Sequence, residues 1–268
     1  MKNIETIWVL VATTDHGILQ NHRLLNLETN PNFQLVISNQ QIHNKTPLKL
    51  DKPYTTVLNS TAQGLSANRN NLLDAVKSGI GILADDDVSY REDLEPFIRT
   101  HFQDNPAFDI LSFQIHDYDG TPYKTYPKKA IKLLSNSLIN RYRLLRISSV
   151  ELAFRICSIK NNSLSFHTDF GIGSKKYIAG EEGIFLLDAL KKGLALKYCP
   201  EPMTYHPGEG TGKKWEASQL IALGRLYKKA FGGLSIFLSV YIAIKKHRTL
   251  QANGIGFFKR LRLLIFGQ

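Results

Sequence analysis

Three consecutive aspartates, Asp85, Asp86 and Asp87, follow a short apolar run over residues 79–84. The run predicts a buried β-strand, so the aspartates fall where that strand would end. Adjacent like charges repel one another and are costly near an apolar core, so we expect a positive group beside them. In an extended chain residues i and i+2 point the same way, so Asp85 and Asp87 could share one divalent cation. A solvated acidic turn is the alternative interpretation of the triplet.

The first half of the chain alternates between strand and helix patterns. Apolar runs predict strands over residues 7–12, 33–38, 55–59, 79–84 and 108–116. Apolar residues at helical spacing predict helices over residues 19–27, 65–77 and 93–102. This alternation predicts a mostly parallel sheet with helices on both faces. In such sheets ligands bind beyond the carboxyl ends of the strands, where the polar loop 13–17, the pair Ser38 and Asn39, and the aspartates all fall.

The second half of the chain is more basic and less regular, above all between residues 122 and 149. Its clearest predicted elements are a helix over 181–192, a strand over 195–200 and an amphipathic helix over 215–231. A basic, apolar tail follows the last helix. We therefore divide the chain into an α/β domain at residues 1–212 and a C-terminal helical extension at residues 213–268.

The charge and cysteine content limit the class of protein. Lysine and arginine number 34 against 23 aspartates and glutamates, a net charge of +11, which predicts an anionic partner. Cys157 and Cys199 lie far apart, which supports neither a disulfide framework nor a zinc site and suits a reducing compartment. The N-terminal residues lack a signal-peptide pattern, and no apolar run approaches the roughly 20 residues of a membrane span. We expect a cytoplasmic protein, either soluble or peripheral on a membrane surface.

Two adjacent glutamates, Glu181 and Glu182, stand between glycines at the start of a predicted helix. The helix dipole and its free N–H groups favour a carboxylate in the first turn, which accounts easily for one of the two. The functional interpretation makes one of them a general base, because a neighbouring carboxylate raises the pKa.

Two cationic side chains could contact an anion. Arg69 lies in the helix that begins near Ser66, where a buried arginine would suit a phosphate, although a surface position is the simpler interpretation. His206 could bind a metal or phosphate only if it lies near Asp87. The glycine-rich stretch 208–213 lacks the spacing of a nucleoside-triphosphate loop.

In order along the chain, these segments resemble family 2 of the glycosyltransferases. The matching segments are Val9–Asp15, Gly64–Asn70, Ile82–Asp87, Phe166–Gly173, Gly180–Leu186, Lys192–Gly193, Tyr198–Pro200 and His206. The resemblance extends from about residue 7 to residue 212. The chain departs from the family pattern in three places, one of which is a pair of residues. Ala12 replaces a proline, Glu182 replaces the usual catalytic aspartate, and Ser38-Asn39 replaces an acidic pair that binds uracil.

The resemblance implies the GT-A fold and an inverting, metal-dependent transfer from a nucleotide-diphosphate sugar, most simply a UDP-sugar. Asp87 and Asp85, with His206, would hold Mn²⁺ or Mg²⁺ against the donor diphosphate. Glu182, or failing that Glu181, would take the proton of the acceptor hydroxyl. The remaining donor contacts implied are Thr13, Asp15, Asn39, Arg69, Asp85 and Asp86. The implied acceptor is a glycan or lipid-linked glycan of a bacterial capsule, lipopolysaccharide or exopolysaccharide.

Other interpretations stay open at this point. A nucleotidyltransferase on a related sheet would also need a carboxylate-bound metal. A nucleic-acid-binding module would explain the charge, but the basic residues lack interleaved stacking aromatics, so we expect no nucleic-acid partner. The tail over residues 234–268 mixes apolar and basic groups, which suits the inner face of an anionic membrane. The alternative is that it packs on the catalytic domain or on a second subunit in a homo-oligomer.

Overall fold

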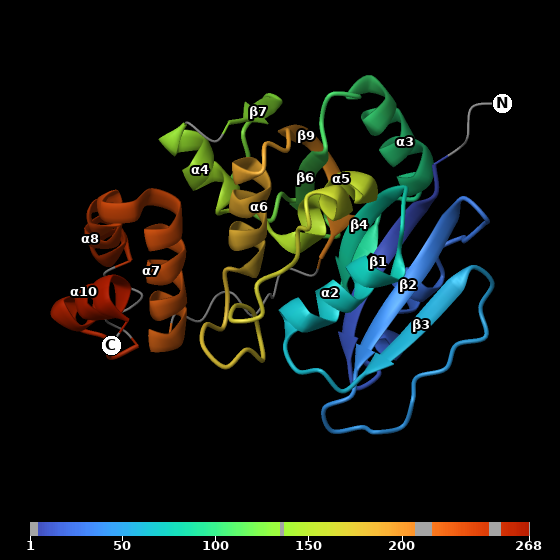
Figure 1. Ribbon diagram of the computed structural model, residues 1–268, viewed down its shortest axis with the longest axis horizontal. Coiled ribbons are helices and arrows are strands. Elements are labelled where there is room, and N and C mark those ends of the chain that lie inside the picture. Colours follow the sequence, from blue (N-terminus) through green and yellow to red (C-terminus); the bar gives the residue numbers. More distant parts are fainter. Residues whose placement is uncertain (1–4, 135–136, 207–215, 247–252, 268) are drawn as a thin grey trace.

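The computed structural model describes residues 5–134, 137–206, 216–246 and 253–267 (Figure 1). A nine-stranded sheet in these residues has the order β3-β2-β1-β4-β8-β6-β9-β5, with β7 paired to β9. The strands are β1 (Ile7–Thr14), β2 (Phe33–Gln40), β3 (Thr55–Ser60), β4 (Ile80–Asp85), β5 (Ser89–Tyr90), β6 (Ile110–His116), β7 (Ile131–Leu133), β8 (Leu152–Arg155) and β9 (Leu196–Tyr205).

The sheet is mostly parallel, as the sequence predicts. Strands β3, β2, β1 and β4 pair in parallel, and so do β6 and β9. The short strand β8 runs antiparallel between β4 and β6, and β5 and β7 run antiparallel to β9. The carboxyl ends of β1, β2 and β4 therefore lie side by side at one edge of the sheet.

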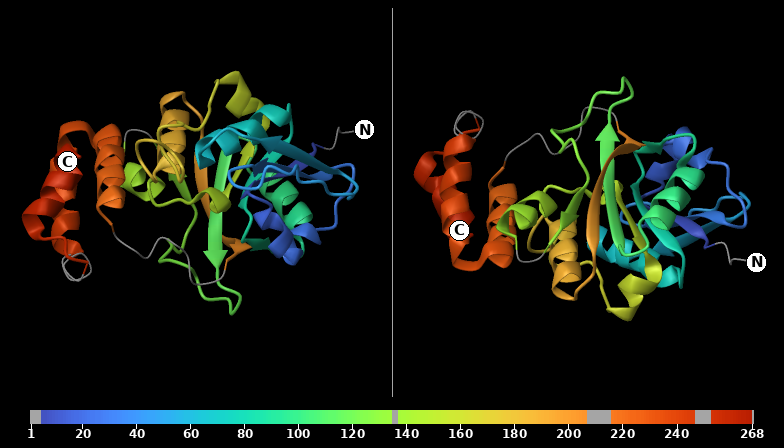
Figure 2. Two further views of the ribbon diagram at one scale, coloured as in Figure 1. Left: turned by 90° about the horizontal axis from the view of Figure 1, so that it is seen from below. Right: turned by 90° about the horizontal axis from the view of Figure 1, so that it is seen from above.

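Helices cover both faces of the sheet because its central strands are apolar on both sides. In β1, Leu10 and Ala12 belong to one buried cluster, and Val9 and Val11 to another. The first cluster includes residues of α2 (Leu65–Ala75), α5 (Ile156–Asn161) and α6 (Glu181–Lys191). The second includes residues of α3 (Leu94–Asp104) and of the short helix α1 (His22–Leu25). Figure 2 shows α2 and α3 on opposite faces.

Two regions differ from the predicted elements. The predicted helix over 19–27 is a 3-10 turn, η1 (Gly17–Gln20), followed by α1, because the side chain of Asn21 accepts the N–H of Leu24 and starts a new helix there. The basic region 122–149, predicted to be irregular, contains β7 and helix α4 (Leu138–Leu144). The 3-10 turn η2 (Ser149–Glu151) and strand β8 follow directly.

The C-terminal extension is helical, as predicted. It consists of α7 (Ala217–Phe231), the 3-10 turn η4 (Gly232–Leu234), α8 (Ser235–Lys245) and α10 (Phe257–Phe266). These helices pack together at the end of the molecule opposite β3 (Figure 1). The predicted boundary at residue 212 lies outside the described residues. By length and composition the stretch Ala217–Lys245 could cross a membrane, but Gly232, with φ of 57°, ends α7, and α8 folds back against it.

Helices α7 and α10 approach each other closely at Gly224. A Cβ atom at this position would fall on the backbone carbonyl of Leu264. The contact also places Arg260, which is fully buried, so that its guanidinium donates to the carbonyl oxygens of Ile255 (2.7 Å) and Ala243 (3.1 Å). The three C-terminal helices are therefore joined by backbone contact and by one buried arginine.

We expect Gly224→Ala to separate α10 from α7 and to lower the unfolding free energy by about 1–3 kcal/mol, the usual cost of overpacking. Gly233→Ala is the matched control, since a Cβ there meets no atom within 4 Å. Chemical denaturation followed by circular dichroism measures both variants. Equal stability of the two variants would show that the close contact is absent in solution.

Candidate active site

The predicted donor-site segments meet at the carboxyl edge of the sheet. Ala12 pairs with Asp85 and Thr13 pairs with Asn39 in the parallel ladders. Helix α2 follows β3 and contacts the end of β1, where the Asn68 side chain donates to the Thr13 carbonyl (3.0 Å). Four segments that are far apart in the sequence are thus held together by strand pairing and one buried amide.

Each aspartate of the triplet has its own partner. Strand β4 ends at Asp85 and the chain turns at Asp86, so the extended alternation expected for the triplet does not reach Asp87. Asp85 accepts from Arg69 (2.9 Å), and Asp86 accepts from the Thr13 hydroxyl (2.5 Å). Asp87 lies 3.2 Å from Nε2 of His206. The positive group expected beside the triplet is therefore Arg69, which pairs with Asp85, whereas the partner of Asp87 is the His206 imidazole.

The environments of Asp86 and Asp87 shift their pKa values in opposite directions. Burial raises the pKa of Asp86, against the hydrogen bond from Thr13. The hydrogen bond and charge of His206 lower the pKa of Asp87 despite its burial. Gly17 completes this arrangement, because a Cβ there would collide with the Asp86 carboxylate. Asp87 is thus the more readily ionised of the two.

Arg69 is buried and joins both halves of the site. Its guanidinium lies among three carboxylates, at 2.9 Å from Asp85 and 3.2 Å from each of Glu181 and Glu182. It also donates to the Ser149 hydroxyl at 2.7 Å. Only 1% of the side chain is exposed, and burial opposes its charge while the carboxylates raise its pKa. The partners that the structure shows for Arg69 are carboxylates, and the contact with a donor phosphate stays a prediction.

The two glutamates that begin α6 occupy different environments. The side chain of Glu181 is 5% exposed, and its Oε2 has no hydrogen-bond partner among the described residues. Burial, followed by the charge of Glu182, raises the pKa of Glu181 to about 8. Glu182 is 19% exposed and lines a cavity of about 310 Å³ between α6, α7 and residues 145–148. Glu182 can therefore reach a ligand, whereas Glu181 faces Arg69 inside the protein.

The predicted nucleoside contacts mainly hold the loops at this edge. The Asp15 carboxylate accepts backbone N–H groups of Ile42, His43 and Asn44 at 2.8–3.0 Å. Asn39 is fully buried and bonds to Asn59 (3.0 Å). Thr13 is 3% exposed and bound to Asp86. The structure brings all three to the strand ends but leaves little of Asn39 or Thr13 for a ligand.

An open cavity of about 520 Å³ lies beside the aspartates, and sequence reasoning missed most of its lining. Asp86 and Asp87 form one side, and the other side comes from the turn η1, from α1 and from Tyr118. Arg23 stacks on the Tyr118 ring, with its Cζ 4.1 Å from the ring centroid. The available signal was a polar, basic run at residues 20–23 directly after the first strand's loop.

The donor set fits a divalent cation only in part. Asp87 and His206 are adjacent and supply an oxygen and a nitrogen, which suits Mn²⁺, whereas Mg²⁺ prefers oxygen ligands. Asp85 is already bound by Arg69. Among the described residues no group of three or more His, Cys, Asp or Glu side chains could by itself hold a metal ion. A cation here would need oxygens from its ligand or from water.

The fold defined by this sheet and site is the GT-A fold. TarS from S. aureus, residues 1–349, superposes with a TM-score of 0.59 and 12% identity, covering 97% of this chain and 81% of TarS. TarS in complex with UDP-GlcNAc gives 0.59 and 14%, covering 93% and 75%. A longer TarS structure has a TM-score of 0.58 and 15% identity, with 93% of this chain and 45% of TarS covered. No protein-family model and no curated protein sequence matches the chain.

We expect Arg69→Met to destabilise the protein by about 3–5 kcal/mol, because it leaves the Asp85 and Glu182 side chains without the buried cation that they contact. Lys176→Met is the control. Lys176 is exposed and pairs with Asp169 (2.7 Å), and we expect a loss of about 0–1 kcal/mol. Urea denaturation at pH 7 measures both variants. Similar losses would contradict a central role for Arg69.

A pH dependence follows from Glu181. Its folded-state pKa of about 8 exceeds the ordinary value of 4.5, so the folded protein keeps a proton that the unfolded chain releases. The unfolding free energy should therefore fall as pH rises from about 4.5 to about 8. Glu181→Gln should flatten this decline, whereas Glu92→Gln, at an exposed position, should not. Urea midpoints measured across this pH range test the expectation, and an unchanged slope in Glu181→Gln would refute it.

Proposed function

We propose that this protein is a glycosyltransferase that uses a nucleotide-diphosphate sugar, most simply a UDP-sugar. The observation that carries the proposal is one buried contact in a GT-A fold. Arg69 links Asp85, which precedes the two aspartates that line the open cavity, to Glu182, which lines a second cavity. TarS, whose fold this chain shares, binds UDP-GlcNAc and UDP.

The donor would lie along the edge formed by β1, β2 and β4. The open cavity beside Asp86 and Asp87 has room for a diphosphate, and Arg23 brings positive charge to its far side. Asp87 and His206, with Asp85, would hold Mn²⁺ or Mg²⁺, which would neutralise charge on the departing nucleotide diphosphate. Asp15 and Asn39 would shape the nucleoside pocket by holding residues 42–44 and 59 in place.

Glu182 is the proposed general base. It takes the proton of an acceptor hydroxyl while that oxygen forms a bond to the anomeric carbon. The bond from this carbon to the diphosphate breaks with its electron pair, so the transfer is a single displacement with inversion. Arg69 holds the Glu182 carboxylate (3.2 Å) and acts as a positioning residue.

The proposed acceptor is a glycan or lipid-linked glycan in bacterial surface-polysaccharide synthesis. A nucleotidyltransferase is the competing proposal, and its product distinguishes the two. In one incubation with UDP-sugars and Mn²⁺, a glycosyltransferase would release UDP from the donor. In a second incubation with a nucleoside triphosphate and a sugar phosphate, a nucleotidyltransferase would release pyrophosphate. Release of pyrophosphate without UDP would overturn the proposal.

We expect Glu182→Gln to lower turnover by about two to four orders of magnitude while UDP binding is kept, since the amide cannot accept the proton. Release of UDP measures turnover, and calorimetry measures UDP binding. Glu92→Gln serves as the control with the same chemical change at an exposed position. If Glu181→Gln is the inactive variant instead, the roles of the two glutamates are exchanged.

The C-terminal helices are proposed to bind an anionic membrane surface. Residues 217–268 contain nine lysines and arginines and no aspartate or glutamate. Exposed apolar groups gather on α8 and α10, including Phe237 (73% exposed) and Phe258 (84% exposed). Lys245, Lys259 and Arg262 are exposed on the same two helices. Aromatic and basic side chains together suit an anionic lipid interface, which would place the enzyme beside a lipid-linked acceptor at the cytoplasmic face.

We expect the double variant Phe237→Ser, Phe258→Ser to lose binding to vesicles that contain phosphatidylglycerol, because two interfacial aromatics are removed. Ile139→Ser is the control, since Ile139 is 66% exposed but lies on α4. Co-sedimentation at about 0.1 M salt measures binding. Equal binding by both proteins would reject the membrane role. A concentration-dependent change in mass that the double variant loses would assign the same surface to a homo-oligomer.

A further inference from the structure

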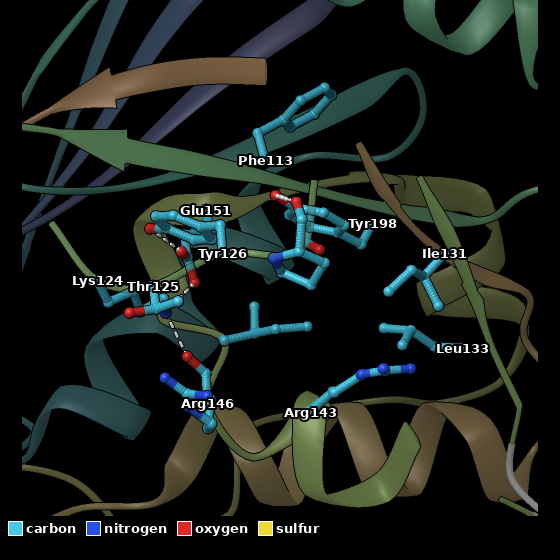
Figure 3. Close-up of a pocket in the computed structure, with 13 residues that line it drawn as sticks. Phe113, Lys124, Thr125, Tyr126, Ile131, Leu133, Arg143, Arg146, Glu151 and Tyr198 are labelled. Carbon is cyan, nitrogen blue, oxygen red and sulfur yellow. Dashed lines mark hydrogen bonds and ion pairs between the residues drawn. The ribbon is translucent and has the colours of Figure 1, made fainter. Parts of the chain in front are cut away.

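A third cavity lies away from the donor edge, between the sheet and α4 (Figure 3). Its volume is about 210 Å³. Clefts for drug-sized ligands measure about 300–1,000 Å³, so this cavity suits a single ring rather than a nucleotide. Strands β6, β7 and β9 supply one side, and α4 with the turn after it supplies the other.

The walls of this cavity are fixed by buried polar contacts. Glu151, which is 1% exposed, accepts from Lys124 (2.7 Å) and from the Tyr126 hydroxyl. The Tyr198 hydroxyl accepts from Gln114 (2.7 Å) and donates to a backbone carbonyl. The rings of Tyr126 and Tyr198 are nearly parallel, 4° apart, with centroids 6.3 Å apart. Two aromatic rings held by hydrogen bonds therefore form one wall of the cavity.

One polar group in the wall lacks a partner. Ser112 on β6 is 3% exposed, and its hydroxyl makes no hydrogen bond with the described residues. It lines this cavity. A buried hydroxyl without a partner costs free energy, so a ligand that hydrogen-bonds to it would be favoured. This observation is independent of the cavity's shape.

Two arginines lie opposite the aromatic wall (Figure 3). Arg143 and Arg146 line the cavity and form no ion pair with a carboxylate in the part of the chain that the structure describes. Lys124, by contrast, is neutralised by Glu151 (2.7 Å). Two guanidinium groups without a carboxylate partner favour an anionic ligand.

Arg146 and Ile147 also line the cavity that holds Glu182. The two cavities are therefore neighbours, separated by the Arg146 and Ile147 side chains. On the proposed function, an acceptor with its hydroxyl at Glu182 would extend past Arg146 toward Tyr126 and Tyr198.

From these contacts we propose that the cavity binds a sugar ring that carries an anionic group, as the part of the acceptor next to the reacting hydroxyl. The ring lies against the tyrosines, a ring hydroxyl bonds to Ser112, and Arg143 and Arg146 bind the anion. Phosphate and carboxylate substituents share this chemistry, and the test below separates them.

Saturation-transfer NMR of the full chain with glucose 6-phosphate, glucuronate, glucose and inorganic phosphate tests the proposal. We expect one or both anionic sugars to bind, and glucose and inorganic phosphate to bind about tenfold or more weakly, the effect of losing charge-assisted hydrogen bonds. The stronger of the two anionic sugars identifies the substituent. Octyl phosphate that binds more tightly than either would overturn the proposal in favour of a lipid chain.

Variants locate the binding. Arg143→Gln and Arg146→Gln should each weaken the anionic sugar about tenfold, and Ser112→Ala should weaken it less. Lys77→Gln, an exposed position with the same change in charge, should bind as the original protein does. Unchanged binding in both arginine variants would overturn the proposal. UDP binding in the same samples distinguishes failure of this inference from failure of the proposed function.

Discussion

The guanidinium of Arg69 is the interaction on which the candidate site depends. A buried cation such as Arg69 is tolerated because Asp85, Glu181 and Glu182 surround it, since a charge left without a partner in the interior is costly. Strand β4, helix α2 and the start of α6 are therefore fixed relative to one another. Asp85 at the donor edge and the proposed base Glu182 both contact the same guanidinium group.

The surrounding polar contacts strengthen the same constraint. Helix α2 is tied to the loop before α6, since Ser66 donates to the Phe170 carbonyl (2.6 Å) and Asn70 bonds to the backbone of Phe166. Phe166 in turn stacks on Phe185 of α6, with ring centroids 4.4 Å apart. A single polar helix therefore carries contacts to both halves of the site. This explains why so short a segment can be polar and buried at once.

The sequence predicted those strands and helices whose apolar residues recur with a regular spacing. The strands β1, β2, β3, β4 and β6 and the helices α2, α3, α6 and α7 were found from apolar periodicity, because each buries a continuous face. Strand β7 has three residues and strand β8 has four, and each lies in a basic or mixed context. Their strand conformation depends on pairing with β9, β4 and β6, which no local pattern reveals.

By itself the sequence determined the class of fold and the chemical groups at the site: an arginine in a helix, an acidic triplet after the strand that follows this helix, and two glutamates at a later helix start. Only the tertiary structure decided how these groups are paired. The aspartates point to three different partners, Glu181 is buried while Glu182 reaches a cavity, and Arg69 binds carboxylates. The reason is physical. Charge and periodicity are local properties of a sequence, whereas burial and ion pairing depend on which distant segments share one interior.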